Sequence, residues 1–341
     1  MTPLSICIPT YNFGRFLPVT LDSILAQGYS DIEIVIVDGA STDDTPIVID
    51  KYQKIFKYLT YHRLPAKGGI DKDIALSVKL ATREYCWLFS ADDCMATGAL
   101  KRVIPLLNNG CDVYLCGVLL CDKEMTPEVT HHYFRYDSHD TDFELSDRSE
   151  RLRYFSKAKT TTALFSFLSS IIIKKTKWDS ADDSWFQFNS SYWGHVARLF
   201  SLIPNGLRVK VIHESLVNKR GENDSFYCGD IAKRIGVAVY GFSGVAKHYF
   251  GEQSEECELI HNLIRNEWPL IAFINYRSEL VSKGLSIDLL DSTFGDCYSG
   301  KGLRIAITRM IYNHEYFHFT VRLFNLAQRL KWTIAKLKSN G

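Results

Sequence analysis

Two near-continuous apolar segments close to the start of the chain constrain the fold most. Residues 4–10, LSICIPT, and residues 32–37, IEIVIV, each have the composition of a buried strand. Between them, residues 16–27, FLPVTLDSILAQ, place apolar side chains at helical spacing and stop before Gly28. A buried strand, a helix and a second buried strand in this order predict a parallel sheet that is covered on both faces.

The same alternation continues along the chain, with helices expected at 45–56 and 70–82 and strands at 58–63 and 85–89. The predicted fold class is therefore α/β, a Rossmann-like and mostly parallel sheet flanked by helices. Ligands of such sheets bind at the carboxyl ends of the strands. We therefore expect the residues that follow the strands to gather on one edge, namely residues 9–12, Asp38, Asp92 and Asp93.

Beyond residue 110 the pattern is weaker. Strands are expected at 111–122 and 165–175, a helix at 190–203, and one or two further strands within 206–225. Residues 122–150 are polar and are expected to form a long loop.

Composition excludes several classes of protein. The 40 Lys and Arg residues nearly cancel the 39 Asp and Glu residues, so nothing favours a nucleic-acid binder that neutralises phosphates. Nine cysteines without a C-x-x-C pair are typical of reduced core residues rather than of a zinc site or a disulfide framework. Without a signal-peptide pattern or an apolar run of about 18 residues, a cytoplasmic location is expected.

Three carboxylates follow buried strands: Asp38, Asp92 and Asp93. Gathered on one sheet edge, they would repel one another unless a cation or a hydrogen-bond donor lay among them. A Mg²⁺ or Mn²⁺ ion bound by carboxylates and substrate phosphates would resolve that conflict. The alternative is that Asp92 or Asp93 caps a helix beginning near residue 97.

Three motifs in order resemble one known family: SICIPTYN at 5–12, IEIVIVDGASTDDT at 32–45 and EYCWLFSADD at 84–93. Together they resemble glycosyltransferase family 2, whose members are inverting, nucleotide-sugar-dependent enzymes with the GT-A fold. The later segments SSIIIKK at 169–175 and SSYWGHV at 190–196 are similar to bacterial O-antigen sugar transferases, including abequosyltransferases.

The resemblance assigns roles to the residues on the predicted edge. Asp38 is expected to accept a hydrogen bond from the nucleotide base, Asp93 to bind the metal directly, and Asp92 to reach the ribose or the metal. Ser90 stands at the first position of the family's metal motif. The nucleotide pocket would be lined by Pro9, Thr10, Tyr11 and Asn12.

Two further segments are expected near the diphosphate. Lys67 and Asp71, in AKGGIDKD, fall where the family has a loop that closes over the nucleotide. Arg220, in NKRGENDSF, would hold a diphosphate oxygen as charge develops on the leaving group, with Asn223 as a second candidate. The alternative for both segments is a solvated polar loop.

The group that accepts the proton is less clearly marked. Many members of the family place a Glu-Asp pair at the start of a helix after the metal motif, where this chain has Gly194 and His195. His195 is a candidate general base because its unperturbed pKa lies near 6.5. Asp182 and Asp183 are the other candidates, as base or as acceptor ligands. The alternatives are a structural histidine and turn or cap residues.

The predicted organisation is a GT-A domain over 1–225, with 1–110 binding the nucleotide sugar and 111–225 on the acceptor side. A helical region over 226–341 follows. Within it, residues 317–338 place apolar side chains on one helical face, flanked by Lys and Arg. This pattern is typical of a helix lying in an anionic membrane interface. The alternative is packing on protein.

The expected activity is transfer of one sugar, a dideoxyhexose among the candidates, from a CDP, UDP, GDP or dTDP donor to a saccharide hydroxyl. Inversion, metal assistance and a lipid-linked O-antigen acceptor on a polyprenyl diphosphate are expected, at the cytoplasmic face of the inner membrane. One rival is a nucleotidyltransferase, which usually has a Gly-rich, basic loop after its first strand. Another is a non-catalytic saccharide-binding protein of the same fold.

Overall fold

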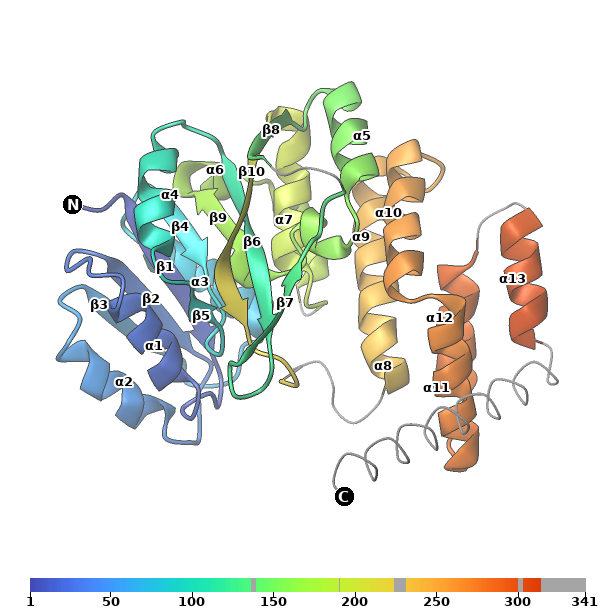
Figure 1. Ribbon diagram of the computed structural model, residues 1–341, viewed down its shortest axis with the longest axis horizontal. Coiled ribbons are helices and arrows are strands. Elements are labelled where there is room, and N and C mark those ends of the chain that lie inside the picture. The colour runs from blue at the N-terminus through green and yellow to red at the C-terminus, as the bar shows by residue number, and fades with distance from the viewer. Residues whose placement is uncertain (136–138, 190, 224–230, 300–302, 314–341) are drawn as a thin grey trace, which may run out of the picture. The chain divides into compact units, whose positions relative to one another are not determined.

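The computed structural model describes residues 1–135, 139–189, 191–223, 231–299 and 303–313 (Figure 1). In this part of the chain ten strands form one sheet in the order β3-β2-β1-β4-β9-β6-β10-β5, with β7 beside β6 and β8 beside β10. The strands are β1 Leu4–Thr10, β2 Glu33–Asp38, β3 Leu59–Arg63, β4 Tyr85–Leu88, β5 Cys94–Met95, β6 Val113–Cys121, β7 Pro127–His131, β8 Thr141–Glu144, β9 Ile171–Lys174 and β10 Arg208–Lys219.

The helices alternate with strands up to residue 107 and then predominate after residue 230. They are α1 Leu17–Leu25, α2 Thr45–Gln53, α3 Ile70–Leu80, α4 Ala99–Leu107, α5 Arg148–Lys157, α6 Lys175–Asp179, α7 Gly194–Leu202, α8 Ile231–Gly236, α9 Phe242–Phe250, α10 Glu255–Glu267, α11 Leu270–Ser282, α12 Asp288–Cys297 and α13 Leu303–Asn313. Short 3-10 helices occupy Thr161–Leu164, Leu168–Ser170, Asp183–Phe188 and Ile203–Asn205, and a π-helical turn occupies Val237–Gly241. None of the helices described is long and apolar enough to cross a bilayer.

The first half of the sheet is parallel, which confirms the α/β prediction. Strands β3, β2, β1 and β4 run in one direction, with Thr10 paired to Asp38 and Leu4 to Tyr85. All residues of β1, β2 and β4 are buried, as the continuous apolar runs predict. On one face α1, α2 and α4 contribute to a single hydrophobic cluster with alternate strand residues, while α3 contacts β1 and β2.

The second half of the sheet is mixed. Strand β9 lies antiparallel between β4 and β6, and β10 runs parallel to β6. The pairing of β10 with β6 shifts register between Ile212 and Val217. A Cβ on Gly117 would lie 2.6 Å from the Glu214 carbonyl oxygen. Only glycine therefore fits where the irregular part of β10 runs beside β6.

Two sequence-based expectations were wrong in this half. Residues 122–150 are not one long loop, because they contain β7, β8 and the start of α5. The strand expected at 165–175 is only β9, Ile171–Lys174, preceded by two 3-10 helices. Strand β7 is mostly exposed, so it lacks the apolar alternation that identifies a half-buried strand.

The chain forms two compact units. Unit 1 comprises residues 1–224 and 245–260, and unit 2 comprises residues 225–244 and 261–341. The sequence predicted one boundary, after residue 225, with residues 226–341 forming the helical region. In the structure, residues 245–260 belong to unit 1. The basic segment 317–338 lies outside the described residues, so its proposed membrane contact stays a prediction.

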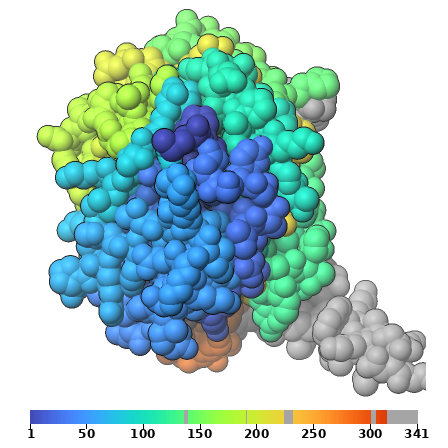
Figure 2. All heavy atoms as spheres, turned by 90° about the vertical axis from the view of Figure 1, so that its left-hand side faces the viewer, coloured from blue at the N-terminus to red at the C-terminus, as the bar shows by residue number. Residues whose placement is uncertain are grey.

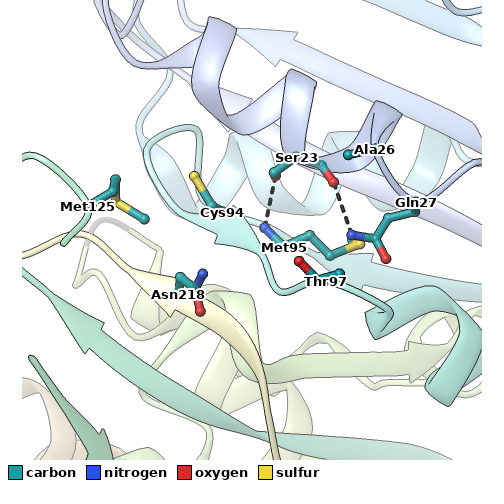
Figure 3. A pocket seen from close by; sticks show the side chains of 8 residues that line it. All are labelled: Ser23, Ala26, Gln27, Cys94, Met95, Thr97, Met125 and Asn218. Carbon is teal, nitrogen blue, oxygen red and sulfur yellow. Dashed lines mark hydrogen bonds between the residues drawn. The ribbon is translucent and has the colours of Figure 1, made fainter. Parts of the chain in front are cut away.

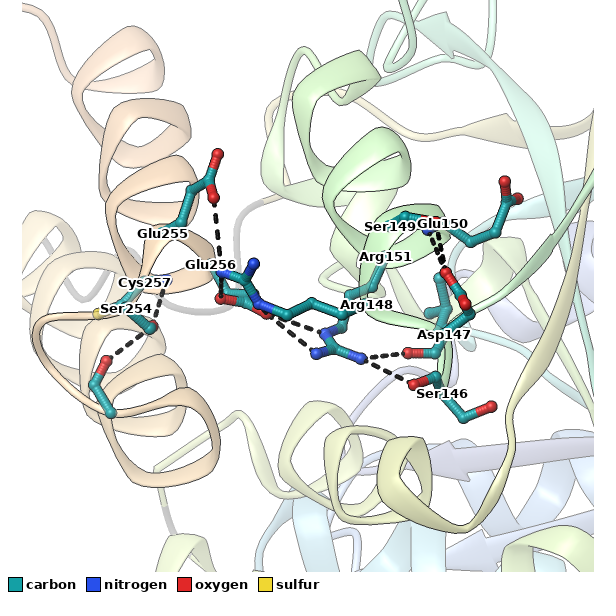
Figure 4. A network of polar contacts seen from close by, with 12 residues as sticks. Ser146, Asp147, Arg148, Ser149, Glu150, Arg151, Ser254, Glu255, Glu256 and Cys257 are labelled. Carbon is teal, nitrogen blue, oxygen red and sulfur yellow. Dashed lines mark hydrogen bonds and ion pairs between the residues drawn. The ribbon is translucent and has the colours of Figure 1, made fainter.

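Residues 245–260 are tied to α5 by ion pairs to Glu256 (Figure 4). The Glu256 carboxylate, only 5% exposed, lies 3.0 Å from Arg151 and 3.2 Å from Arg148. The Phe250 ring packs against Phe155 and Phe200, with centroid distances of 5.4 and 5.3 Å. Charge pairing and aromatic packing therefore hold this segment on unit 1.

The edge of the sheet at β3 is close to solvent. Figure 2 looks onto this side, where residues from about the first hundred of the chain, blue to cyan, form a continuous surface. The eight cysteines within the described residues are all buried and form no disulfide there, in agreement with the expectation of reduced core residues.

Candidate functional site

The loops at the carboxyl edge of the parallel strands are held in strained conformations. Positive φ angles occur at Asn12 (59°), Ala40 (66°) and Tyr192 (70°), which lie after β1, after β2 and before α7. Each such residue costs about 1–3 kcal/mol unless its surroundings impose the conformation. Strained residues of this kind cluster at functional sites, so this edge is the place to look for one.

The Asp38 carboxylate organises the turn after β2. Its Oδ1 accepts hydrogen bonds from the Ser41 amide at 2.8 Å and the Ser41 hydroxyl at 2.6 Å. Its Oδ2 accepts one from the Tyr61 hydroxyl at 2.7 Å and lies 3.8 Å from Arg63 Nε. Asp38 is fully buried, and both of its oxygens are engaged by protein groups. Its position is the one predicted, but its hydrogen-bonding capacity is largely used within the protein.

The loop after β1 is joined to this turn. The Asn12 amide donates to Ser41 Oγ at 2.8 Å, and Asn12 Oδ1 accepts from the Thr42 amide at 2.7 Å. The Tyr11 ring is half-buried, with the Lys67 ammonium 3.9 Å from its centroid. Residues 9–12 and Lys67, all expected near the nucleotide, thus meet beside Asp38. Thr10 is buried, and its Oγ1 has no hydrogen-bond partner among the described residues.

Asp73, which no sequence motif identified, lies beside the same two loops. It is in the first turn of α3, is 4% exposed, and its Oδ1 has no hydrogen-bond partner within the described chain. Burial, together with the Asp38 carboxylate, raises the pKa of Asp73 to about 6. An Asp in the first helical turn is ordinary in a sequence because it complements the helix dipole. Only the tertiary structure shows that this one is enclosed.

Asp71 has a different surrounding. Its two oxygens accept hydrogen bonds from the Tyr192 and Gly194 amides, each at 3.0 Å. A Cβ on Gly194 would lie 2.9 Å from Asp71 Cβ and Cγ, so glycine is required at 194 for the carboxylate to reach the start of α7. Asp71, expected to bind the donor, therefore holds the amino-terminal end of α7 in place.

The Asp92–Asp93 pair lies beyond β4 with its four oxygens engaged. Asp92 accepts hydrogen bonds from the Ser90 hydroxyl and, at 2.6 Å, from Asn223 Nδ2. Asp93 accepts one from Ser169 Oγ at 2.6 Å and one from the Arg220 amide at 3.1 Å. Burial, and then the adjacent Asp92 carboxylate, raise the pKa of Asp93 to about 7.

The helix-cap alternative for this pair is wrong. Helix α4 begins at Ala99 with Gly98 as its N-cap, and no side chain caps it. The shared environment of the two aspartates instead comes from Ser169 and residues 220–223, which are distant in sequence.

The donor set at Asp92 fits a divalent cation completed by diphosphate oxygens. The two groups on Asp92, Ser90 and Asn223, are neutral side chains that can rotate away, whereas Asp93 is held by a backbone amide and is only 2% exposed. Mg²⁺ in such sites commonly takes one or two carboxylates plus substrate phosphates. Elsewhere in the described residues, too, no group of three or more His, Cys, Asp or Glu residues is placed to hold an ion by itself.

Arg220 is buried beside Asp92 and Asp93. Its Nε donates to the Asp92 carbonyl at 3.1 Å, its Nη1 donates to the Lys123 carbonyl, and its guanidinium lies 4.9 Å from the Phe16 ring centroid. The guanidinium is thus oriented by main-chain carbonyls on both sides. It adds positive charge close to Asp92 and Asp93.

His195 is buried in the first turn of α7. Its Nε2 lies 3.0 Å from the Phe165 carbonyl oxygen, which can only accept, so Nε2 carries the proton and Nδ1 has the free lone pair. Nδ1 has no partner in the described structure. Burial lowers the pKa of His195 to about 4, so the ring is neutral at pH 7.

Asp182 and Asp183 lie elsewhere, at an exposed 3-10 helix. Asp182 caps this helix by accepting from the Ser184 amide at 2.9 Å, and hydrogen bonds from Ser184 hold the pKa of Asp182 below its usual value. Ser184 in turn contacts the Tyr249 hydroxyl at 2.9 Å. In the described structure, no hydrogen bond or ion pair joins the two aspartates to Asp38, Asp92 or His195. Asp182 fits the cap alternative.

A cavity of about 260 Å³ lies between α1, β5 and β10 (Figure 3). None of its lining residues is charged, and the Gln27 side chain already donates to the Ser23 and Ala96 carbonyls. It borders the aspartate pair only through Cys94. The cavity therefore lacks the cationic or metal-binding groups that a diphosphate needs. Its lining residues are Ser23, Ala26, Gln27, Cys94, Met95, Thr97, Met125 and Asn218.

Comparison with known proteins gives a consistent result. The sequence profile of glycosyl transferase family 2 matches residues 5–172. The chain is 32% identical over 276 residues to the abequosyltransferase RfbV of Salmonella typhimurium, covering 78% of this chain and 81% of that protein. It is 26% identical over 203 residues to a Campylobacter jejuni enzyme named GalNAc(5)-diNAcBac-PP-undecaprenol beta-1,3-glucosyltransferase, covering 59% of each.

The fold is also found among solved structures. The Staphylococcus aureus TarS fragment 1–349 in complex with UDP-GlcNAc aligns with a TM-score of 0.59 at 15% sequence identity. The alignment covers 94% of this chain and 88% of that structure. At this identity the likeness concerns the fold, and it agrees with the GT-A architecture that the family resemblance implied.

Proposed function

Because the chain belongs to glycosyltransferase family 2, we propose that it transfers one sugar from a nucleoside diphosphate to a hydroxyl group of a saccharide acceptor. The observation that carries this proposal is the convergence, on the carboxyl edge of the parallel strands, of strained loops and enclosed carboxylates. Ligands of open α/β sheets bind at this edge.

We place the nucleoside against the loops after β1 and β2. The Tyr11 ring offers a stacking surface, and the two loops are locked together through Asn12 and Ser41. Lys67, whose ammonium already lies beside that ring, is suited to meet the diphosphate. Asp38, which the resemblance assigned to the base, shapes this pocket through the turn that it organises.

The cation belongs at the end of β4. We assign Asp92 as the carboxylate that faces it, since displacing the Ser90 and Asn223 side chains frees both oxygens. Asp93, which the sequence suggested as the direct metal ligand, instead accepts hydrogen bonds from Ser169 and the Arg220 amide. We therefore assign it the role of positioning Asp92. When bound, Mg²⁺ or Mn²⁺ would neutralise charge on the departing diphosphate. The buried Arg220 guanidinium adds to that effect.

The reaction proposed is a single displacement with inversion. The acceptor oxygen forms a bond to the anomeric carbon as the bond to the diphosphate oxygen breaks, and the electron pair leaves with the nucleoside diphosphate. The hydroxyl proton must pass to a base. His195 Nδ1 is the candidate, because its tautomer leaves a lone pair there. Its low pKa makes it a weak base, and it is enclosed, so an acceptor hydroxyl must reach it within the assembled complex.

The acceptor is proposed to be a lipid-linked O-antigen intermediate. Support comes from the similarity to an abequosyltransferase and to an enzyme whose name specifies an undecaprenol-linked acceptor. Such an acceptor would require work at the cytoplasmic face of the inner membrane. The basic segment 317–338 is the proposed contact with that surface.

The test is calorimetric titration of the full chain with nucleoside diphosphates, with and without Mn²⁺, followed by mass spectrometry of acceptor saccharides incubated with the matching sugar donor. We expect cation-dependent binding of a nucleoside diphosphate. Asp92→Asn should lose the cation dependence and lower turnover on the order of 100-fold, comparable to other electrostatic groups at reacting centres. Asp50→Asn, on the exposed face of α2, is the matched control and should change neither.

Two results would overturn the proposal. Failure of any nucleoside diphosphate to bind, with or without cation, would remove the donor site. Binding without transfer, unaffected by Asp92→Asn, would instead support a non-catalytic saccharide-binding protein of this fold.

A further inference from the structure

We propose that Lys159 and Lys219 bind an anionic group of the acceptor, a phosphate or a carboxylate, beside one face of β6, β7 and β10. This inference rests on the function proposed above and names the class of acceptor. It concerns the part of the sheet beyond the Asp92–Asp93 pair, away from the strands β1 and β2 whose loops are proposed to hold the nucleoside.

The first argument is the order and direction of the strands. The nucleoside is placed at the ends of β1 and β2, and the aspartate pair follows β4. Strands β6, β7 and β10 lie on the other side of β4, across β9. Because β9 is antiparallel to both β4 and β6, and β10 is parallel to β6, the ends of β6 and β10 lie on the same edge as the aspartate pair. An acceptor can therefore approach the diphosphate from this side.

The second argument is that four side chains share one face. Lys219 on β10 is paired with Leu120 on β6, and Leu120 is paired with Val129 on β7. Side chains of paired residues point to the same face, and so does His131, two residues after Val129. Val129 is 56% exposed and Leu120 is half-buried. These four residues, which we call the open face, are therefore accessible to a ligand.

Lys219 joins the open face to the aspartate pair. Its ammonium lies 5.3 Å from the centroid of the Phe167 ring. Burial and Asp92 raise the pKa of Asp93, and Lys219 acts in the opposite sense, so its charge is close to that carboxylate. The next residue, Arg220, donates its amide to Asp93. A group held by Lys219 would therefore lie near the proposed cation site.

The third argument is the positive charge that surrounds His131. Its Nε2 lies 3.2 Å from Thr162 Oγ1 and 3.3 Å from Thr160 Oγ1. Burial lowers the pKa of His131 to about 4, and the nearby Lys219 and Lys159 ammonium groups add to that effect. Two ammonium groups thus lie close to one ring that is uncharged at pH 7.

Neither lysine has a counter-charge among the described residues. Both are exposed, and neither forms an ion pair there, whereas Lys210 on the same strand β10 is paired with Asp142. Like charges repel, and an anion bound by both ammonium groups would relieve that repulsion. Phosphate and carboxylate groups are the anions that lysine commonly binds.

The experiment first fills the donor site of the full chain with a nucleoside diphosphate and Mn²⁺, and then titrates two anions by calorimetry. These are geranyl diphosphate and methyl glucuronide, and geraniol and methyl glucoside are their uncharged counterparts. We expect at least one anion to bind about tenfold or more tightly than its uncharged counterpart, as expected for a hydrogen bond to a charged group. The anion that binds distinguishes a lipid-linked diphosphate from a sugar carboxylate.

Lys159→Gln and Lys219→Gln should each weaken binding of that anion about tenfold. Lys219→Arg keeps the charge and should retain binding to within about threefold. Lys101→Gln, which removes an exposed charge on α4, is the matched control and should have no effect. Binding of the nucleoside diphosphate, measured first for each variant, reports whether the variant is folded.

The outcomes separate this inference from the proposed function. Equal anion binding in Lys159→Gln, Lys219→Gln and Lys101→Gln, or no preference for an anion, would show that the two lysines are only solvated surface charges. Weaker nucleoside diphosphate binding in Lys219→Gln would assign that lysine to the donor. Either result would overturn the inference and leave the transferase proposal standing, whereas a wild type that binds no nucleoside diphosphate would overturn both.

Discussion

Two buried carboxylates on the same sheet edge, Asp93 and Asp73, differ in their hydrogen bonds although both are enclosed. Burial raises the pKa of both, to about 7 and about 6, and in each case a neighbouring carboxylate adds to the effect. Yet Asp93 accepts hydrogen bonds from Ser169 and Arg220, whereas Asp73 Oδ1 has no partner in the described structure. Asp93 is therefore held by hydrogen bonds within the folded chain, and Asp73 Oδ1 is not.

The largest loss of stability is expected at a third carboxylate, Asp71. Its hydrogen bonds to the Tyr192 and Gly194 amides require that residue 194 be a glycine. Gly194→Ala would place a Cβ 2.9 Å from Asp71 Cβ and Cγ. Overpacking of this kind typically costs about 1–3 kcal/mol, and loss of the hydrogen bonds to Asp71 adds to it, so we expect a decrease of about 3 kcal/mol in the free energy of unfolding. Urea denaturation measures it.

The control for that variant is Gly295→Ala in α12, where a new Cβ meets no atom within 4 Å. It should be neutral or slightly stabilising, since alanine restricts the unfolded chain. In a double variant with Asp71→Gly, which removes both Cβ and Cγ, the Gly194→Ala cost should shrink; an undiminished cost would show that the contact with Asp71 is not its source.

Removing a donor from Asp93 should have the next largest effect. Ser169 Oγ donates to Asp93 and accepts from the Ser90 amide at 2.9 Å, so Ser169→Ala leaves two buried groups unpaired. We expect a loss of about 2 kcal/mol of stability, within the range for unsatisfied buried groups. Ser180→Ala, whose exposed hydroxyl bonds only the Lys177 carbonyl, should change stability little. Equal effects of the two variants would contradict the role of these hydrogen bonds in holding Asp93.

Asp73 should behave in the opposite way, because its charge is not stabilised. The unfolded chain ionises Asp73 near pH 3.9, while the folded chain holds the proton until about pH 6. Between these values a rise in pH favours unfolding, so stability is lost as pH rises through 6. Asp73→Asn removes that loss. The variant should therefore be more stable than the wild type at pH 8, by about 1–2 kcal/mol, with the difference vanishing toward pH 4.

Urea denaturation curves at several pH values between 4.5 and 8 measure this crossover. A variant that is less stable than the wild type at pH 8 would show that Asp73 has a stabilising partner after all, and the contrast with Asp93 would fail.

The smallest effect is expected at Asp38. Tyr61→Phe removes one of the hydrogen bonds to this carboxylate but leaves the Ser41 amide and hydroxyl in place. We expect a loss of about 1 kcal/mol, the usual contribution of one hydrogen bond, measured by thermal unfolding. A loss well above that of Ser169→Ala would indicate that Asp38 depends on Tyr61 alone.

The parallel half of the sheet could be predicted because its signals are local. Strands β1, β2 and β4 are continuous apolar runs, and α1 repeats apolar residues at helical spacing. Strand β7 was missed because its exposed, polar residues carry no such period. The placement of residues 245–260 was missed because it depends on Glu256 meeting Arg148 and Arg151, more than a hundred residues away in sequence.

The candidate site, too, could be predicted only in part. The residues that follow the buried strands could be placed on one edge of the sheet, since the direction of the parallel strands fixes where they lie. Which carboxylate is engaged and which is free could not be read from the sequence. Ser169 and Arg220 reach Asp93 only through the tertiary fold, and Asp73 resembles any acidic residue in the first turn of a helix.

The return of residues 245–260 to unit 1 has a consequence for synthesis on the ribosome. A nascent chain that has emerged only as far as residue 244 has β1 to β10 and α5, but not Glu256 or Phe250. Until those residues emerge, Arg151 lacks its buried counter-charge, and the Phe155 and Phe200 rings lack the ring that packs on them. Unit 1 can therefore complete its folding only after part of the following helical unit has been translated, a delay during which apolar surface is available to chaperones.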